Sequence, residues 1–255
     1  MAEKSYLLWD FDGVVVDSID ECLITSYNAF LKHQNKSEFI DNLGNIAEKV
    51  AKEFKSIRKY VRAPRGYFIL HKAIHEDKNI TCFSTFEDYF NSHKNEIGSY
   101  EDIFYSMRNK LRNRNSQYWI NLHHVYPWVK ESWDLLKYYF EYFIVSNKDA
   151  HSISLILQNA GMAIDTNRIF GKEFNIEKTK IVKHILENFE IEEDGAFFID
   201  DNSVNLQEVS KLSIRLFFAS WGYEEIFKTK NDGIITLKKE DFVNQLLEAH
   251  EKQVC

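Results

Sequence analysis

Two aspartates stand one residue apart, directly behind an apolar run near the start of the chain. The run Tyr6–Trp9 leads into Asp10, Phe11, Asp12 and Gly13. Carboxylates are costly to bury and repel one another at short range, so this placement favours a site that binds a cation, performs chemistry, or does both. An ionised aspartate can attack phosphorus, a second can donate a proton to the leaving oxygen, and glycine permits the backbone turn that such a site needs.

Polar side chains also follow two later apolar runs. Ser146 comes directly after Tyr139–Val145, and Asp200 and Asp201 come directly after Ala196–Ile199. Parallel α/β sheets place their ligands at the carboxyl ends of the strands, so we expect these groups to meet the first two aspartates. Acidic, oxygen-rich sites suit Mg²⁺, which binds a few carboxylates together with water and phosphate oxygens.

Phosphoryl transfer requires of a protein mainly positioning and charge neutralisation. The Ser146 hydroxyl could hydrogen-bond a phosphoryl oxygen, and a later lysine could neutralise its charge. The residues alone leave three candidates for that lysine, namely Lys172, Lys178 and Lys180.

The apolar pattern predicts the elements that position these groups. Short apolar runs alternate with amphipathic helices at both ends of the chain, which predicts an α/β fold with a Rossmann-like parallel sheet as its core. Between about residues 35 and 120, charged residues alternate with aromatics at helical spacing, which predicts an inserted all-helical cap. We therefore expect residues 1–18 and 125–255 to form the core and residues 19–124 to form the cap.

Several residues have a structural interpretation at helix ends. Ser18 and Glu21 have the spacing of a capping box, and Gly161 is a candidate C-cap. Ser146 could act as the N-cap of the helix that follows it, with or without a role in phosphate binding. The Asp200–Asp201 pair could likewise cap the next helix. A C-terminal helix is expected to begin near Lys239.

Composition narrows the class of protein. The 255 residues are 44% apolar, which predicts a packed globule, and the formal charge of −7 argues against a general nucleic-acid binder. The three cysteines are widely spaced, without metal-ligand spacing, which indicates a reducing compartment. The chain shows no signal peptide and no apolar run that could cross a membrane, so we expect a cytoplasmic protein without a membrane partner.

Four ordered segments resemble the motifs of the haloacid dehalogenase-like (HAD) hydrolase superfamily. The first, DFDGVVVDS at residues 10–18, is similar to the DxDG(x)nDS motif of the family's phosphatases and is the most specific. The second is Phe143–Asn147, the third is Lys178 ahead of a helix, and the fourth is Phe198–Asn205. The helical insertion resembles the cap of the branch that is similar to phosphoglycolate phosphatase and β-phosphoglucomutase.

The resemblance implies a role for each matching residue. Asp10 would be the nucleophile and a metal ligand, and would form an aspartyl-phosphate. Asp12 would be the general acid and base and would bind the metal through its backbone carbonyl, and Asp201 would be a further metal ligand. The phosphoryl group would be held by Ser146, Asn147 and Lys178, with Lys172 and Lys180 as alternatives to the lysine.

Two positions depart from the common form of the fourth motif. Asp200 occupies the place of a glycine, and Asn205 stands where many relatives have a second acid. The role of Asn205 at the metal is therefore left open, although an amide can still hydrogen-bond. Both residues are candidates for contacts behind the metal ligands.

The insertion offers a second candidate site in a cluster of basic residues, Lys55, Arg58, Lys59, Arg62 and Arg65. The functional interpretation is a lid loop that recognises an anionic leaving group, with Arg62 and Arg65 as the contacts on either side of a turn. The alternative is a solvated basic helix face, which we favour for most of the cluster. A second basic run, from Arg108 to Arg114, is also interpreted as a helix surface.

These features together predict a magnesium-dependent phosphatase that hydrolyses a small phosphorylated metabolite. A phosphomutase would use the same chemistry, and a non-catalytic binding protein could share the scaffold. A response-regulator receiver also places Asp, Ser or Thr, and Lys around magnesium, but its acid pair and its phosphorylated aspartate come from different strands, which fits this order less well.

Overall fold

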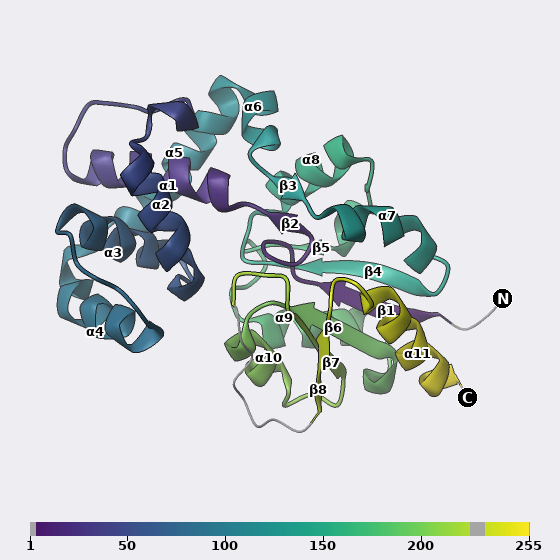
Figure 1. Cartoon of the computed structure of the whole chain (residues 1–255). Coiled ribbons are helices and arrows are strands. Elements are labelled where there is room, and N and C mark those ends of the chain that lie inside the picture. Colours follow the sequence, from purple (N-terminus) through teal and green to yellow (C-terminus); the bar gives the residue numbers. More distant parts are fainter. Residues whose placement is uncertain (1–3, 225–232, 255) are drawn as a thin grey trace. The chain divides into compact units, whose positions relative to one another are not determined.

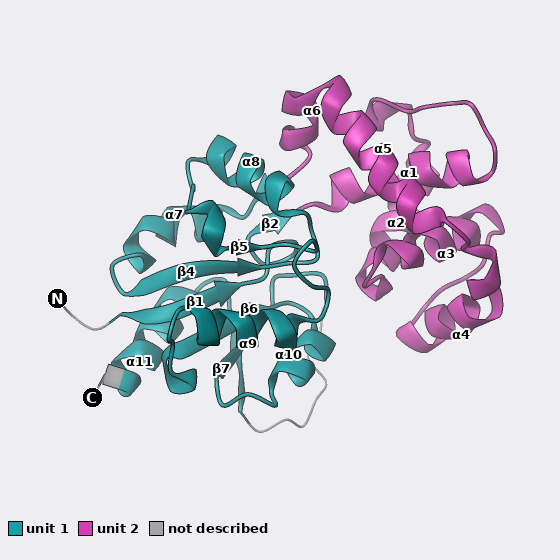
Figure 2. Ribbon diagram, turned by 180° about the vertical axis from the view of Figure 1, so that it is seen from behind, with its two compact units in different colours: residues 1–17, 124–255 teal, residues 18–123 magenta. Residues whose placement is uncertain are grey.

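The protein is described by a computed structural model that covers residues 4–224 and 233–254. The chain divides into two units, which Figure 2 shows in different colours. Unit 1 combines Met1–Asp17 with His124–Cys255, and unit 2 is the inserted segment Ser18–His123.

A six-stranded parallel sheet forms the centre of unit 1 (Figure 1). Its order is β5-β4-β1-β6-β7-β8, so the first strand of the chain lies between β4 and β6. The parallel sheet confirms the predicted α/β, Rossmann-like core. The strands are β1 (Ser5–Trp9), β4 (Phe140–Val145), β5 (Ile169–Phe170), β6 (Ala196–Asp200), β7 (Arg215–Ala219) and β8 (Ile234–Leu237).

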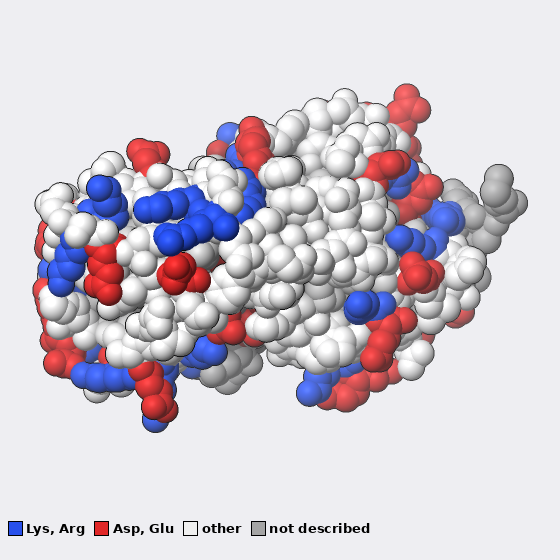
Figure 3. All heavy atoms as spheres, turned by 90° about the horizontal axis from the view of Figure 1, so that it is seen from above, with Lys and Arg blue, Asp and Glu red and all other residues white. Residues whose placement is uncertain are grey.

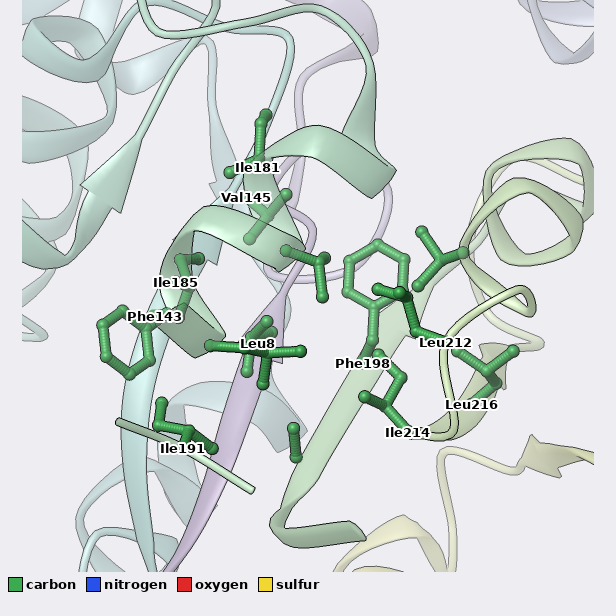
Figure 4. Packing of buried hydrophobic residues seen from close by; sticks show 14 of the residues in the cluster. Leu8, Phe143, Val145, Ile181, Ile185, Ile191, Phe198, Leu212, Ile214 and Leu216 are labelled. Carbon is green, nitrogen blue, oxygen red and sulfur yellow. The ribbon is translucent and has the colours of Figure 1, made fainter. Parts of the chain in front are cut away.

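The central strands are apolar on both sides because helices cover both faces of the sheet. On one face, Leu8, Phe143 and Phe198 pack against α9 (Lys178–Asn188) and α10 (Ser203–Val209), and Figure 4 shows this cluster. On the other face, side chains of the strands pack against α7 (Pro127–Leu136) and α11 (Phe242–Val254). The alternation of side chains along each strand thus divides the core into two layers.

Capping residues set both ends of α8 (Ala150–Ala160). The side chain of Asp149 accepts a hydrogen bond from the Ser152 backbone N–H at its start, and Gly161 ends it with a φ of 74° in the left-handed region. The predicted C-cap is therefore confirmed. The N-cap role considered for Ser146 is wrong, because Asp149 is the N-cap of α8 and Ser146 lies three residues before it.

Three other local expectations are corrected. Ser18 makes no side-chain capping hydrogen bond at the start of α1 (Ile19–His33), because Glu21 turns into unit 2 and pairs with a buried arginine. Asn202 is the N-cap of α10, so the capping role considered for Asp200 and Asp201 is also wrong. The C-terminal helix begins at Phe242, three residues beyond the expected start.

Every α-helix of unit 2 contributes to a separate core. Aromatic rings from three of them stack, with Tyr67 between Phe54 and Phe104 at centroid distances of 5.8 and 5.4 Å. Unit 2 is therefore held together by its own buried side chains. Besides α1, its α-helices are α2 (Glu48–Ile57), α3 (Pro64–His75), α4 (Phe83–His93), α5 (Tyr100–Arg114) and α6 (Ser116–Asn121).

A short two-stranded sheet lies where the chain leaves and re-enters unit 1. Strand β2 (Val16–Asp17) pairs antiparallel with β3 (His124–Val125). The two crossing segments are thus hydrogen-bonded to each other.

The surface carries charges of both signs. On the face shown in Figure 3, Lys and Arg side chains lie among Asp and Glu side chains. Among the described residues, none of the helices combines the length and the apolar character needed to span a membrane.

Candidate active site

The sheet brings the ends of β1 and β6 together. Trp9 is paired with Ile199, and the backbone N–H of Asp10 donates to the Ile199 carbonyl at 2.8 Å. Asp10 therefore lies level with Asp200, the last residue of β6. β4 lies on the other side of β1 and leads directly into Ser146. The predicted meeting of strand ends follows from this register.

Three buried acids form the centre of the site. Carboxylate oxygens of Asp10, Asp200 and Asp201 all lie within 4.8 Å of one another, and all three side chains are buried. The Lys178 ammonium lies 2.6 Å from Asp10 Oδ1 and 2.7 Å from Asp200 Oδ2, and it is buried as well. One lysine thus contacts two of the three acids.

Burial and neighbouring charges shift the pKa values of both Asp10 and Lys178. Burial raises the pKa of Asp10 well above its ordinary value; the Lys178 ammonium opposes this effect, and the carboxylates of Asp200 and Asp201 add to it. Burial lowers the pKa of Lys178, but the carboxylates of Asp10 and Asp200 raise it by more, so the net shift is upward. The lysine therefore stays charged, and Asp10 needs positive charge nearby to remain ionised.

Asp200 is held by hydrogen bonds from the chain that follows it. Its Oδ1 accepts the Asn202 backbone N–H at 2.8 Å, and the amide nitrogen of Asn205 lies 3.0 Å from Oδ2 and 3.2 Å from Oδ1. Asn205 stands where many relatives have a second acid, and its side-chain amide donates to the carboxylate of Asp200. This arrangement orients Asp200 without adding another negative charge to a buried site.

Asp12 is paired with a lysine that sequence analysis did not single out. Lys148 Nζ lies 3.2 Å from Asp12 Oδ1, and its side chain is only 1% exposed. Lys148 comes two residues after Ser146, whose hydroxyl oxygen accepts the Lys148 backbone N–H at 3.2 Å. Buried lysines are rare, so the sequence alone favours a surface position for Lys148. Its place directly after the end of a predicted strand is the feature that could have marked it as a site residue.

The remaining candidates in unit 1 differ in their environments. Ser146 is buried beside the strand ends, whereas the Asn147 side chain is exposed. Lys180 lies on the surface and pairs with Glu177 at 2.7 Å. The structure therefore brings Lys178, rather than Lys180, to the buried acids.

The arginines of unit 2 fall into two groups. Arg62 and Arg65 are exposed, and the Arg62 guanidinium lies 4.7 Å from the centroid of the Phe83 ring. Arg58 is buried and donates to the Val61 carbonyl at 2.8 Å, and Arg108 is buried against Glu21. The interpretation of Arg58 and Arg108 as solvated helix surface is therefore wrong.

The chemistry of the donors fits a divalent cation. Lys178 contacts two of the three buried carboxylates, and a hard cation with oxygen ligands would balance the negative charge of the cluster. Asp10, Asp200 and Asp201 each offer a carboxylate oxygen to such a cation. Gly13, with a φ of +93°, borders Asp201: a Cβ atom there would lie 2.2 Å from Asp201 Oδ2.

Solved structures match the fold of the chain over nearly its whole length. A predicted phosphoglycolate phosphatase from Haemophilus somnus 129PT matches with a TM-score of 0.64 and 16% identity, over 96% of this chain and 99% of that one. The chain has the haloacid dehalogenase-like fold. A HAD-superfamily hydrolase of subfamily IA, variant 1, from Geobacter sulfurreducens PCA matches with a TM-score of 0.56 and 13% identity, over 96% of this chain and 100% of that one.

A predicted phosphatase from Clostridium acetobutylicum has the same fold, with a TM-score of 0.62 and 17% identity over 97% of this chain and 100% of its own. No protein-family model matches the sequence. No curated protein matches it either. The structural likeness thus confirms the resemblance in fold.

Proposed function

We propose that the protein is a metal-dependent phosphatase that hydrolyses a small phosphorylated metabolite through an aspartyl-phosphate on Asp10. The observation that carries the proposal is the buried cluster of Asp10, Asp200 and Asp201 around Lys178 at the ends of β1 and β6. The neighbouring structures described as phosphatases support the same reaction class.

The proposed metal is Mg²⁺, which Asp10, Asp201 and the Asp12 backbone carbonyl would hold. When bound, it would neutralise carboxylate and phosphoryl charge. Lys178 would add a second positive charge on the same side, and the Ser146 hydroxyl, with Asn147, would donate hydrogen bonds to phosphoryl oxygens.

The first step transfers the phosphoryl group to the protein. A carboxylate oxygen of Asp10 forms a bond to phosphorus while the bond from phosphorus to the ester oxygen breaks. The electron pair stays on the leaving oxygen, which takes a proton from the Asp12 carboxyl group. The Lys148 ammonium beside Asp12 would hold that carboxyl group in place.

The second step releases inorganic phosphate. The oxygen of a water molecule bonds to phosphorus, the bond between phosphorus and Asp10 breaks, and the Asp10 carboxylate is restored. Asp12, now a carboxylate, accepts the proton of the water. The acid of the first step thus serves as the base of the second.

Unit 2 would act as the cap, with Arg62 and Arg65 as candidate contacts for the leaving group. Closure of a cap would exclude water during the first step. The described cysteines, Cys22 and Cys82, are free thiols, which supports the proposed cytoplasmic setting.

The test is phosphate release from a panel of phosphate esters, with and without Mg²⁺. The wild type should release phosphate from at least one ester only with metal, and Asp10→Asn should lose that activity. The matched control is Asp194→Asn, an exposed aspartate before the start of β6 in the same unit, which should retain it. An isomerised ester without free phosphate would indicate a mutase, and no change in any ester would argue for a binding protein.

A further inference from the structure

The loop that follows β7 contacts both Asp201 and the first-motif segment, residues 10–18. It starts at Ser220, whose backbone N–H and hydroxyl both donate to the Leu237 carbonyl, at 3.2 and 2.7 Å. The loop is thereby fixed to the end of β8. The next three residues, Trp221, Gly222 and Tyr223, face residues far away in the sequence.

The loop orients Asp201 by a direct hydrogen bond. The backbone N–H of Tyr223 donates to Asp201 Oδ2 at 2.6 Å. Carboxylates that bind metals are usually fixed by such hydrogen bonds, and these partners tune metal affinity. The next residue of the loop, Glu224, contacts the chain just after Asp201: its carboxylate accepts the backbone N–H and the hydroxyl of Ser203, both at 2.8 Å.

Gly222 lets the loop backbone lie against Asp201. A Cβ atom at position 222 would lie 2.2 Å from Asp201 Cβ and 2.4 Å from its Oδ2, far inside van der Waals contact. Gly13 lies equally close to the same carboxylate. Asp201 is therefore packed between two glycines, one from the first-motif segment and one from this loop.

Side chains of the loop hold the first-motif segment itself. Trp221 Nε1 donates to the Val14 carbonyl at 3.0 Å, and the Tyr223 hydroxyl lies 3.3 Å from Asp17 Oδ1. The Trp221 ring packs edge-on against Phe242 of α11 at 5.4 Å. The loop thus contacts residues on both sides of the proposed metal site.

We propose that Trp221, Gly222 and Tyr223 are positioning residues that fix Asp201 relative to the segment carrying Asp10 and Asp12. This inference rests on the proposed function, because it assigns the loop to the same metal site. A loop that served only to pack the fold would leave metal affinity unchanged when altered without unfolding.

The experiment measures Mn²⁺ binding to the purified full chain by electron paramagnetic resonance and calorimetry. Gly222→Ala should weaken binding by about 10- to 100-fold, the usual effect of losing a partner behind a metal ligand. The Mg²⁺ concentration for half-maximal phosphate release should rise by a similar factor. The matched control is Gly195→Ala at the opposite end of β6, whose new methyl group meets the flexible Gln253 side chain at 3.2 Å.

A second variant covers failure of Gly222→Ala to fold. Trp221→Phe keeps an aromatic ring and removes only the donor to the Val14 carbonyl, and it should weaken Mn²⁺ binding by a few fold. Normal Mn²⁺ affinity in a folded Gly222→Ala, or in Trp221→Phe if the first does not fold, would overturn the inference while leaving the phosphatase proposal intact. A wild type that binds no Mn²⁺ would overturn both.

Discussion

Lys178 contacts the carboxylates of both Asp10 and Asp200, and this double contact determines the charge balance of the site. An isolated buried lysine would lose its proton, whereas two carboxylates hold its pKa above the ordinary value. The same ammonium partly offsets the effect of burial on Asp10. At the residue scale, the lysine and the acids therefore depend on each other for their ionised forms.

Replacing Lys178 with methionine tests this dependence. The change leaves two buried carboxylates without their cation, which should cost about 3–5 kcal/mol in the free energy of unfolding. Phosphate release should fall below detection. The measurements are urea unfolding and the phosphate assay, with Lys183→Met, an exposed lysine on the same helix, as the control. Wild-type stability in Lys178→Met would contradict the account of the ion pair.

Individual residues of the site were predictable to different degrees. Asp10 and Asp201 were found because each follows a strand that is apolar on both faces. Lys148 and Arg108 were not, because sequence patterns place lysine and arginine on the surface by default. Their burial follows from tertiary partners, Asp12 and Glu21, that lie far away in the sequence.

Helices α1 and α5 are joined inside unit 2 by a buried ion pair. Arg108 donates to both carboxylate oxygens of Glu21 at 2.8 Å. Thr25 and Trp119 also donate to the same carboxylate, at 2.7 and 3.3 Å. At the scale of elements, this network fixes the position of α1 against its neighbours.

A double-mutant cycle measures what the pair contributes. Arg108→Met alone removes the cation beside the buried carboxylate of Glu21 and should lower the free energy of unfolding by about 3–5 kcal/mol. The double variant Glu21→Leu/Arg108→Met should lose clearly less free energy of unfolding than the sum of the two single losses. Urea unfolding gives the four free energies. Additive effects would show that the two side chains do not interact.

The elements themselves were mostly predictable from short patterns. Apolar runs located β1, β4 and β6, and Gly161 located the end of α8. Strand β8 was missed because it has only four residues, two of them exposed, and so lacks the continuous burial of a central strand. The predicted capping box of Ser18 and Glu21 does not form, because the Glu21 carboxylate pairs with Arg108 instead of hydrogen-bonding the start of the helix.

The stability of the whole molecule should depend on pH through a buried histidine. Burial lowers the pKa of His71 in unit 2 from its ordinary 6.5 to about 3. Between these values the unfolded chain binds a proton that the folded chain does not, so stability falls as pH decreases from 6.5 toward 3, by up to roughly 1.4 kcal/mol per pH unit.

Replacing His71 with glutamine should remove most of this slope, and glutamine can keep a hydrogen bond to the Ser26 hydroxyl, which now lies 2.8 Å from His71 Nε2. Urea unfolding at pH 7 and pH 5 measures the effect. The exposed His151→Gln should leave the slope unchanged. An equal slope in His71→Gln and the wild type would contradict the assignment.

Metal binding should appear as added stability. A ligand that binds only the folded state at a hundred times its dissociation constant adds about 2.7 kcal/mol. Mg²⁺ should therefore raise the unfolding free energy of the wild type and of Asp194→Asn but not of Asp201→Asn. Without metal, Asp201→Asn should be at least as stable as the wild type, because one of three mutually repelling carboxylates is gone. Equal stabilisation of Asp201→Asn by Mg²⁺ would exclude Asp201 as a ligand.

The central claim is that Asp10 accepts the phosphoryl group, and trapping that group tests it most directly. The Asp12→Asn variant should accumulate the aspartyl-phosphate when it is mixed with p-nitrophenyl phosphate and Mg²⁺. The p-nitrophenolate leaving group needs little protonation, whereas hydrolysis of the intermediate by water needs a base. The reaction is quenched in acid. Mass spectrometry should then find one phosphoryl group on the peptide that contains Asp10, and none in the absence of metal. Phosphate release with the phosphoryl group on another residue, or with no phosphorylated protein at any time, would contradict the account.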